Sequence, residues 1–277
     1  MLSLFVATVL MGQDRPHTLT GHIDVIPAFE SKFLNNKRPV WVYLPPDYAK
    51  NLKRRYSVLY MHDGQNVFDG ATSFIPGQEW RADEVAESLI NSNLIEPIII
   101  VGIANAGMDR GDEYLPTRAK MGAGPAVGGR ADLYGRLLIE ELKPFIDRTY
   151  RTLPDARHTA LAGSSFGGIA TLYLGLTHPN VFSKLGVVSP SVWWDDRVML
   201  KRVDALPKAL PLRIWVDIGR QEGDAVGDAE ALRDALIKKG WKLGRDLAYY
   251  EEGYAEHNEL AWSRRMPALL LFLFGRK

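Results

Sequence analysis

Residues 155–174 read DARHTALAGSSFGGIATLYL, and they predict a strand, a sharp turn and a helix in that order. The apolar run before Gly163 is typical of a short buried strand, and the run after Gly168 is typical of a helix. Between them lies a Gly-x-Ser-x-Gly pattern centred on Ser165. In a strand–turn–helix setting this pattern is the nucleophile elbow, which exposes the serine Oγ above the sheet. We therefore expect Ser165 to be a nucleophile; the alternative is a glycine-rich turn that only packs the helix against the strand.

The length suits one large α/β domain as well as two small ones. Because no repeat, low-complexity tract or linker separates two parts, we place a single domain at residues 13–277. The chain has 277 residues, of which 46% are hydrophobic, enough for a sizeable core. A net charge of +1 gives no electrostatic reason to expect nucleic acid or an anionic membrane surface as a partner. The absence of cysteine excludes disulfides, thiolate zinc sites and a cysteine nucleophile.

The first twelve residues, MLSLFVATVLMG, are apolar and uncharged. They are too few to span a bilayer and resemble the apolar part of a secretory signal that lacks its basic start. Ala7 and Gly12 are small residues suited to a cleavage region. We expect an exported protein, periplasmic or secreted, without stable membrane insertion. The alternative is a strand-like start in a cytoplasmic protein.

Strand-like and helix-like segments alternate along the rest of the chain. The strand-like segments, besides the elbow strand, are 39–44, 56–61, 97–103, 182–189, 212–219 and 246–252; the helix-like ones are 80–91, 131–147, 228–240 and 259–274. Apolar strands joined by crossover helices predict a mostly parallel central sheet of about eight strands with helices on both faces. No helix separates 39–44 from 56–61, which predicts an antiparallel edge there. Pro144 predicts a kink or break in the helix at 131–147.

A serine nucleophile needs a base, and histidine is the usual one. Of the six histidines only His178 and His257 follow Ser165 in the chain. His178 ends the elbow helix, whereas His257 lies between the last strand and the last helix, where this chain order requires the base. We expect His257 to be the base; the alternative is a histidine on a surface loop.

An acid that orients the histidine should follow strand 212–219, where the sequence reads DIGRQEGD (217–224). Glu222 stands at the tip of the turn and is the preferred candidate. Asp224 and Asp217 remain alternatives. A carboxylate here can also serve only as a cap of the helix at 228–240.

The loop HDGQNVFDG (62–70) follows an early strand, where a second oxyanion donor is expected. Gly64 allows a close backbone approach, so the N–H of Gln65 is the expected donor beside that of Phe166. His62 is expected to line the site. The alternative is an ordinary Asp63-Gly64 turn.

With these pieces the chain resembles the putative-esterase family of the α/β-hydrolase superfamily, which includes enterochelin-esterase-like, feruloyl-esterase-like and S-formylglutathione-hydrolase-like enzymes. The matching segments are RPVWVYLPPDY (38–48), LYMHDGQNVFD (59–69), DEYLP (112–116), ELKPFID (141–147), AGSSFGG (162–168), VVSPSVWW (187–194) and GYAEHNELAW (253–262). The resemblance implies the α/β-hydrolase fold, Ser165 as nucleophile, His257 as base, Gln65 and Phe166 as oxyanion donors, and neither a metal nor an organic cofactor.

Substrate contacts are expected from two further places. By resemblance Trp193 and Trp194 would wall the substrate pocket; the alternative is that at least one of them is core. The long segment 104–130 is rich in glycine and charge, and long loops of this kind are usually functional. It offers Arg110, Glu113 and Arg118 as candidates for substrate contacts.

These observations together favour a serine carboxylic ester hydrolase with a Ser165–Glu222–His257 triad, a backbone oxyanion hole and an acyl-enzyme intermediate. Its partner would be a small-molecule or saccharide-linked ester. The alternatives are an acyltransferase on the same triad and a non-catalytic, carbohydrate-associated protein of the same fold.

Overall fold

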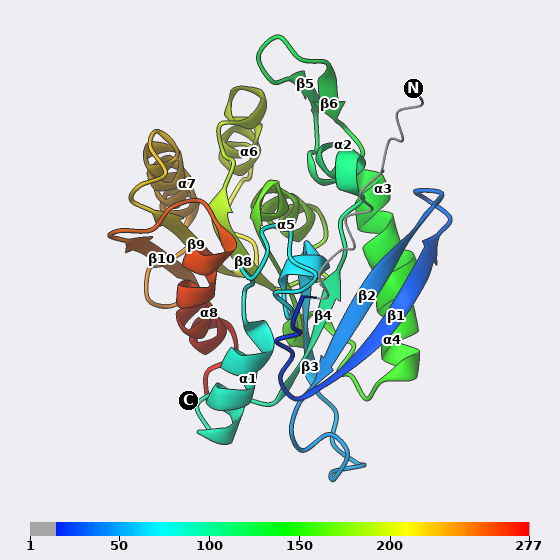
Figure 1. Cartoon of the computed structure of the whole chain (residues 1–277). Coiled ribbons are helices and arrows are strands. Elements are labelled where there is room, and N and C mark those ends of the chain that lie inside the picture. Colours follow the sequence, from blue (N-terminus) through cyan, green and yellow to red (C-terminus); the bar gives the residue numbers. More distant parts are fainter. Residues whose placement is uncertain (1–14, 277) are drawn as a thin grey trace, which may run out of the picture.

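A computed structural model of the chain describes residues 15–276 (Figure 1). Its centre is an eight-stranded sheet in the order β1-β2-β4-β3-β7-β8-β9-β10. The strands are β1 (His22–Ser31), β2 (Asn36–Leu44), β3 (Ser57–His62), β4 (Ile98–Ile103), β7 (Thr159–Ser165), β8 (Lys184–Pro190), β9 (Arg213–Gly219) and β10 (Leu247–Glu252). Strand β2 pairs antiparallel with β1 and β4, and all the other pairs in this sheet are parallel. The expected mostly parallel sheet is confirmed.

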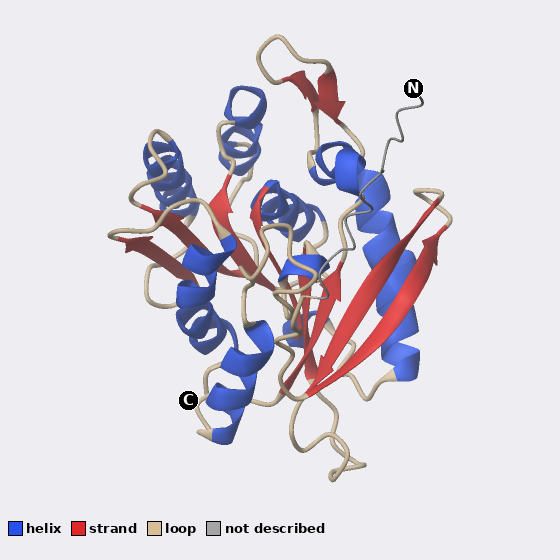
Figure 2. Ribbon diagram, viewed as in Figure 1, coloured by secondary structure: helices blue, strands red, loops and turns tan. Residues whose placement is uncertain are grey.

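Helices cover both faces of this sheet (Figures 1 and 2). They are α1 (Ala82–Asn91), α2 (Arg110–Tyr114), α3 (Ala131–Arg136), α4 (Lys143–Thr149), α5 (Phe166–Thr177), α6 (Trp194–Asp204), α7 (Ala225–Lys239) and α8 (Glu259–Phe274). Buried residues of α1 and α8 pack in one apolar cluster, and those of α3, α5, α6 and α7 pack in another. Alternate residues of a strand feed the two clusters: Val58 and Tyr60 of β3 join one, Leu59 and Met61 the other.

The expected antiparallel edge is only partly correct. The strand predicted at 39–44 lies beside the edge strand β1, but the one predicted at 56–61 lies inside the sheet, parallel to β4 and β7. Strands β2 and β3 run in opposite directions, and the connection between them skips one position in the sheet, which β4 later fills. A connection without a helix therefore did not make the two strands neighbours. The edge strand β1 was not predicted, because most of its side chains are not buried and the sequence shows no clear alternation of apolar and polar residues there.

Pro144 does not end the helix predicted at 131–147. Residues Leu137–Leu142 form a π-helical stretch between α3 and α4, and Pro144 stands in the first turn of α4. A wider turn accommodates the proline, whose ring would clash with the carbonyl four residues earlier in a regular α-helix.

The long segment 104–130 contains helix α2 and a small hairpin of β5 (Arg118–Lys120) and β6 (Ala126–Gly128), which projects from the main sheet (Figure 2). The signal-like segment expected at residues 1–12 lies outside the described residues. Within residues 15–276, no helix is both long and apolar enough to cross a membrane.

Candidate active site

Ser165 is the last residue of β7 and stands at a strained turn. Its backbone has φ 59° and ψ −121°, and α5 begins at the next residue, Phe166. A Cβ on Gly163 would lie 2.7 Å from Cδ2 of His62, and one on Gly167 would lie 3.3 Å from Cβ of the same histidine. The spacing of the glycines is therefore a steric requirement of the turn, as the elbow predicts.

His62 packs against the two glycines of the elbow, so the expectation that it lines the site is wrong. Its side chain is buried, and its Nδ1 lies 2.8 Å from the hydroxyl of Tyr134. Burial lowers the pKa of His62 to about 3, so the ring is neutral at ordinary pH. His62 thus fills the space that the two elbow glycines leave open.

His257 meets one of the three candidate carboxylates. Its Nδ1 lies 2.6 Å from Oε2 of Glu222, and the histidine side chain is 44% exposed while that of Glu222 is 1% exposed. A carboxylate only accepts hydrogen bonds, so Nδ1 carries the proton and Nε2 is left as an acceptor. The ring also packs edge-on against Trp262.

Glu222 is held as an anion by its neighbours. Its Oε1 accepts from the backbone N–H of Gly219 at 2.8 Å and from the hydroxyl of Ser189 at 2.6 Å. Burial by itself raises the pKa of Glu222, but the hydrogen bonds from His257 and Ser189 outweigh it and leave the pKa below its usual value.

The other two carboxylates of the 217–224 turn are placed elsewhere. Asp217 is fully buried inside β9, where its Oδ1 lies 2.9 Å from Nη1 of Arg265. Burial raises the pKa of Asp217 to about 6 despite this pairing. Asp224 precedes α7 without making a side-chain capping bond, so the capping role considered for it is not observed.

The hydroxyl of Ser165 points toward a neighbouring serine. Its Oγ lies 3.2 Å from Oγ of Ser191, which follows β8. Among the described residues it makes no hydrogen bond to His257, although both residues line the same two hollows. Hydrogen bonds of a catalytic group are often completed only when substrate is bound.

The two expected oxyanion donors are available. The N–H of Phe166 opens α5 and the N–H of Gln65 lies in the turn after β3; neither has an acceptor within residues 15–276. The rest of Gln65 is held, since its side-chain oxygen accepts from the N–H of Asn105 and its carbonyl accepts from Thr72. A Cβ on Gly64 would lie 2.4 Å from the backbone of Gly102, so only glycine allows this turn so close to β4.

Arg110 lies in the site but is already engaged. Its Nε and Nη2 donate to the two carboxylate oxygens of Asp63 at 2.7 and 2.8 Å. Its guanidinium also lies over the rings of Tyr114 and Phe166. Burial raises the pKa of Asp63, but the charge and hydrogen bonds of Arg110 outweigh it and lower that pKa overall.

Of the remaining candidates for substrate contacts, some lie at the surface and others are buried in the core of the protein. Trp193 is 43% exposed and lines a hollow beside Ser165, whereas Trp194 is buried and its Nε1 donates to Oγ1 of Thr117. Trp194 is therefore part of the core, which corrects the expectation that it walls the pocket. Glu113 is likewise buried, in a two-bond ion pair with Arg38. Arg118 is exposed on the projecting hairpin.

Two adjoining hollows open at Ser165 and His257. One, of about 520 Å³, extends toward the turn after β3; the other, of about 280 Å³, extends toward β8 and α7. The larger is lined by Asp63, Gln65, Asn66, Phe74, Ile75, Asn105, Gly107, Met108, Arg110, Ser164, Glu259 and Trp262, and the smaller by Phe166, Ser189, Pro190, Ser191, Trp193, Glu222 and Ala225. An ester has room on each side of the nucleophile.

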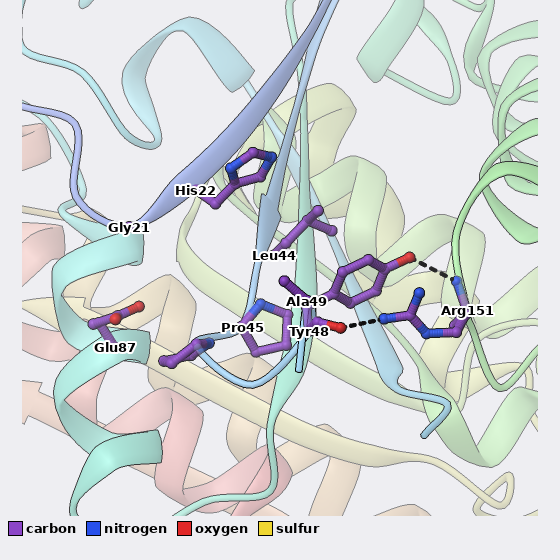
Figure 3. A pocket seen from close by; sticks show the side chains of 9 residues that line it. Gly21, His22, Leu44, Pro45, Tyr48, Ala49, Glu87 and Arg151 are labelled. Carbon is purple, nitrogen blue, oxygen red and sulfur yellow. Dashed lines mark hydrogen bonds between the residues drawn. The ribbon is translucent and has the colours of Figure 1, made fainter. Parts of the chain in front are cut away.

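A further hollow, of about 490 Å³, lies away from this site (Figure 3). It is bordered by Leu44 at the carboxyl end of β2, a strand that runs antiparallel to β4 and to the other parallel strands. The hollow therefore lies at the opposite end of the strands from Ser165. Arg151 is occupied there, because it stacks on Tyr48 and donates twice to it: its backbone N–H to the Tyr48 hydroxyl and its Nη2 to the Tyr48 carbonyl (Figure 3). In the part of the chain that the structure describes, no group of three or more His, Asp or Glu side chains is placed to hold a metal ion.

Three residues behind Glu222 were not predicted from the sequence. Ser189, Trp262 and Arg265 converge there, from the end of β8 and from α8. The one available signal was the position of Ser189, which ends a predicted strand at the same sheet edge as Ser165.

Comparison with known proteins shows which family and which fold the chain is similar to. Residues 31–273 match the family model described as "Putative esterase". The ferri-bacillibactin esterase BesA of Bacillus subtilis is 27% identical over 207 residues, which cover 69% of this chain and 68% of BesA. An endo-1,4-beta-xylanase/feruloyl esterase of Xylanibacter ruminicola is 31% identical over 253 residues, which are 89% of this chain and 31% of that protein. The crystal structure of the enterobactin esterase of Shigella flexneri superposes with a TM-score of 0.71 at 21% identity, covering 95% of this chain and 62% of that one. The fold shared with it is the α/β-hydrolase fold.

Proposed function

The chain belongs to the Putative esterase family and is a carboxylic ester hydrolase, and from this premise we propose that it works through a Ser165–Glu222–His257 triad. The observation that carries the proposal is the 2.6 Å contact between His257 Nδ1 and Glu222 Oε2. It supports the tautomer of His257 that a general base requires, in which Nε2 accepts a proton.

In the proposed reaction, Ser165 Oγ attacks the ester carbonyl carbon while its proton passes to Nε2 of His257. The carbonyl oxygen becomes an oxyanion that accepts from the N–H groups of Gln65 and Phe166. When the tetrahedral intermediate collapses, the ester C–O bond breaks and the departing alcohol takes the proton from His257. Water then repeats the sequence on the acyl-enzyme, releasing the acid and restoring Ser165.

The substrate we propose is a small ester with an apolar or aromatic part. Relatives with the names ferri-bacillibactin esterase and feruloyl esterase support an ester of this general kind. Trp193 and Phe166 offer aromatic surface on one side of Ser165, and Phe74 and Trp262 offer it on the other.

The proposal is tested by labelling and by hydrolysis of an aryl acetate. An organophosphonate should react once per chain, on Ser165, as located by peptide mass spectrometry. Ser165→Ala should remove labelling and lower kcat by about 10⁶, whereas Ser164→Ala should keep most activity. Retention of more than about a hundredth of the rate by Ser165→Ala would refute the nucleophile assignment. Acyl transfer to an added alcohol that exceeds hydrolysis would instead favour an acyltransferase.

A further inference from the structure

We propose that Ser189 is a positioning residue for the catalytic acid: its hydroxyl holds the Glu222 carboxylate in the orientation that serves His257. The proposal rests on the triad proposed above and adds a residue that acts through Glu222 rather than on the substrate. Ser189 stands one residue before the end of β8 and borders the smaller hollow, but it is only 1% exposed and its hydroxyl is engaged with Glu222 and α8.

The direction of each hydrogen bond at Ser189 is determined by its partners. Trp262 Nε1 donates to the hydroxyl at 3.1 Å and Arg265 Nη2 donates at 3.0 Å. An indole and a guanidinium can only donate, so they occupy the two acceptor positions of the Ser189 oxygen. Its single proton is therefore directed to Glu222 Oε1, 2.6 Å away. The hydroxyl has no free rotation left, and Glu222 receives a bond of fixed direction.

The backbone of Ser189 indicates that the side chain has a specific role. Its φ is 39°, in the region that glycine adopts at least cost, and its N–H donates to Oδ1 of Asp217 at 3.2 Å. A strained non-glycine residue at a site is consistent with a function for its side chain. Here the function that the contacts indicate is the bond to Glu222.

The charges around Glu222 explain why this bond matters. Arg265 is buried, and it is shared between Asp217 at 2.9 Å, Glu222 at 3.8 Å and Glu252 at 3.6 Å. Glu222 is thus too far from the guanidinium for a direct hydrogen bond. Ser189 supplies the missing link, because it accepts from Arg265 and donates to Glu222.

The test compares Ser189→Gly with Ser189→Ala on an aryl ester. Both remove the hydroxyl, but glycine also relieves the backbone strain. We expect kcat to fall about 10-fold to 100-fold in both variants with KM nearly unchanged. We also expect the pH of half-maximal kcat on the acid side to rise, because a Glu222 carboxylate without this bond is a stronger acceptor for His257 and makes the Glu222–His257 pair easier to protonate. The groups that face Glu222 and remain in both variants are His257, Arg265, Asp217 and, through Arg265, Glu252.

A matched control exists in Ser57→Ala. Ser57 is also buried, and its hydroxyl donates to Glu96 Oε1 at 3.0 Å, at the start of β3 and far from the triad. This variant should keep the wild-type kcat and pH profile. A Ser189→Gly variant with wild-type kcat, or one whose kcat falls by the same factor at every pH, would overturn the proposal.

A double variant separates this proposal from the triad itself. If Ser189 acts only through Glu222, then adding Ser189→Gly to Glu222→Gln should lower kcat no further. A full additional loss in the double variant would overturn the role of Ser189 and leave the triad intact. Wild-type activity of Glu222→Gln alone would instead refute Glu222 as the acid, and with it the premise of this proposal.

Discussion

The Nδ1 atom of His257 lies 2.6 Å from Oε2 of Glu222, although 35 positions separate the two residues in the sequence. In the proposed triad, replacing Glu222 by Gln removes the charge that would stabilise the imidazolium formed during attack. We expect kcat on an aryl ester to fall by roughly 10³–10⁴ with little change in KM. Steady-state kinetics of the purified variant measure this directly.

Asp224→Asn is the control for that prediction. Asp224 is two residues further along the same turn, and its side chain makes no capping bond to α7. Its loss should leave both kcat and the free energy of unfolding close to wild type. The reverse pattern, with a crippled Asp224→Asn and a normal Glu222→Gln, would move the acid to Asp224.

Arg110 is expected to act on the oxyanion turn rather than on the substrate. It forms two hydrogen bonds to Asp63, which has a positive φ of 56° and lies two residues before Gln65. Arg110→Met leaves the buried Asp63 carboxylate without this partner and lets the Gln65 N–H move. We expect kcat to fall about 10-fold to 100-fold, less than for outright loss of an oxyanion donor.

Arg118→Met provides the comparison, because Arg118 is exposed on the β5–β6 hairpin. It should have wild-type kinetics. An Arg110→Met variant that raises KM alone would show that Arg110 binds substrate, the role that the sequence predicted for it.

His62 should contribute to the pH dependence of stability. Its pKa is about 3 in the folded chain against an ordinary value of 6.5. His62 is therefore protonated below about pH 6.5 in the unfolded chain but only below about pH 3 in the folded chain. The stabilisation is complete above pH 6.5 and is lost as the pH falls, by up to about 1.4 kcal/mol per pH unit.

The measurement is urea unfolding of the wild type and of His62→Asn at pH 7 and pH 4.5. Burial raises the pKa of Glu79 to about 7 and that of Asp83 to about 8. Protonation of these two groups therefore stabilises the folded chain as the pH falls. Glu79 and Asp83 are present in the wild type and in the variant, so their contributions cancel when the two free energies of unfolding are subtracted. The stability advantage of the wild type should shrink at pH 4.5. An advantage that stays constant would show that His62 does not remain neutral.

The part of the fold that the sequence predicted well is the part where local pattern and burial agree. Strand β4 is a continuous apolar run and β9 is mostly apolar, and both were located to within one residue at each end. Helix α6 was missed, since its residues Asp195–Arg197 have positive φ and its start shows no helical pattern. Strand β1 was missed because its exposed side chains carry no periodic signal.

The site divides in the same way. Ser165, Glu222 and His257 could be proposed as a triad from chain order, because each stands at or after the carboxyl end of a parallel strand. The burial of His62 and Trp194 was not predictable, since it depends on tertiary contacts with Gly163, Gly167 and Thr117. The convergence of Ser189, Trp262 and Arg265 depends on how α8 is rotated against β8, which local sequence does not encode.

The adjacent tryptophans should respond to truncation in opposite ways. Trp193 is 43% exposed beside Ser165, whereas Trp194 is 1% exposed, packs edge-on against Phe166 and donates to Thr117. Trp194→Ala should lower the free energy of unfolding by about 3–5 kcal/mol, the cost of removing a large buried aromatic side chain. Trp193→Ala should cost less than about 1 kcal/mol but raise KM for an aromatic acyl ester several-fold more than KM for the matching acetyl ester. Urea unfolding and kinetics on the two esters measure both effects. Equal changes in KM for the two esters would exclude Trp193 as a wall of the acyl site, and a Trp193→Ala variant as unstable as Trp194→Ala would place both rings in the core.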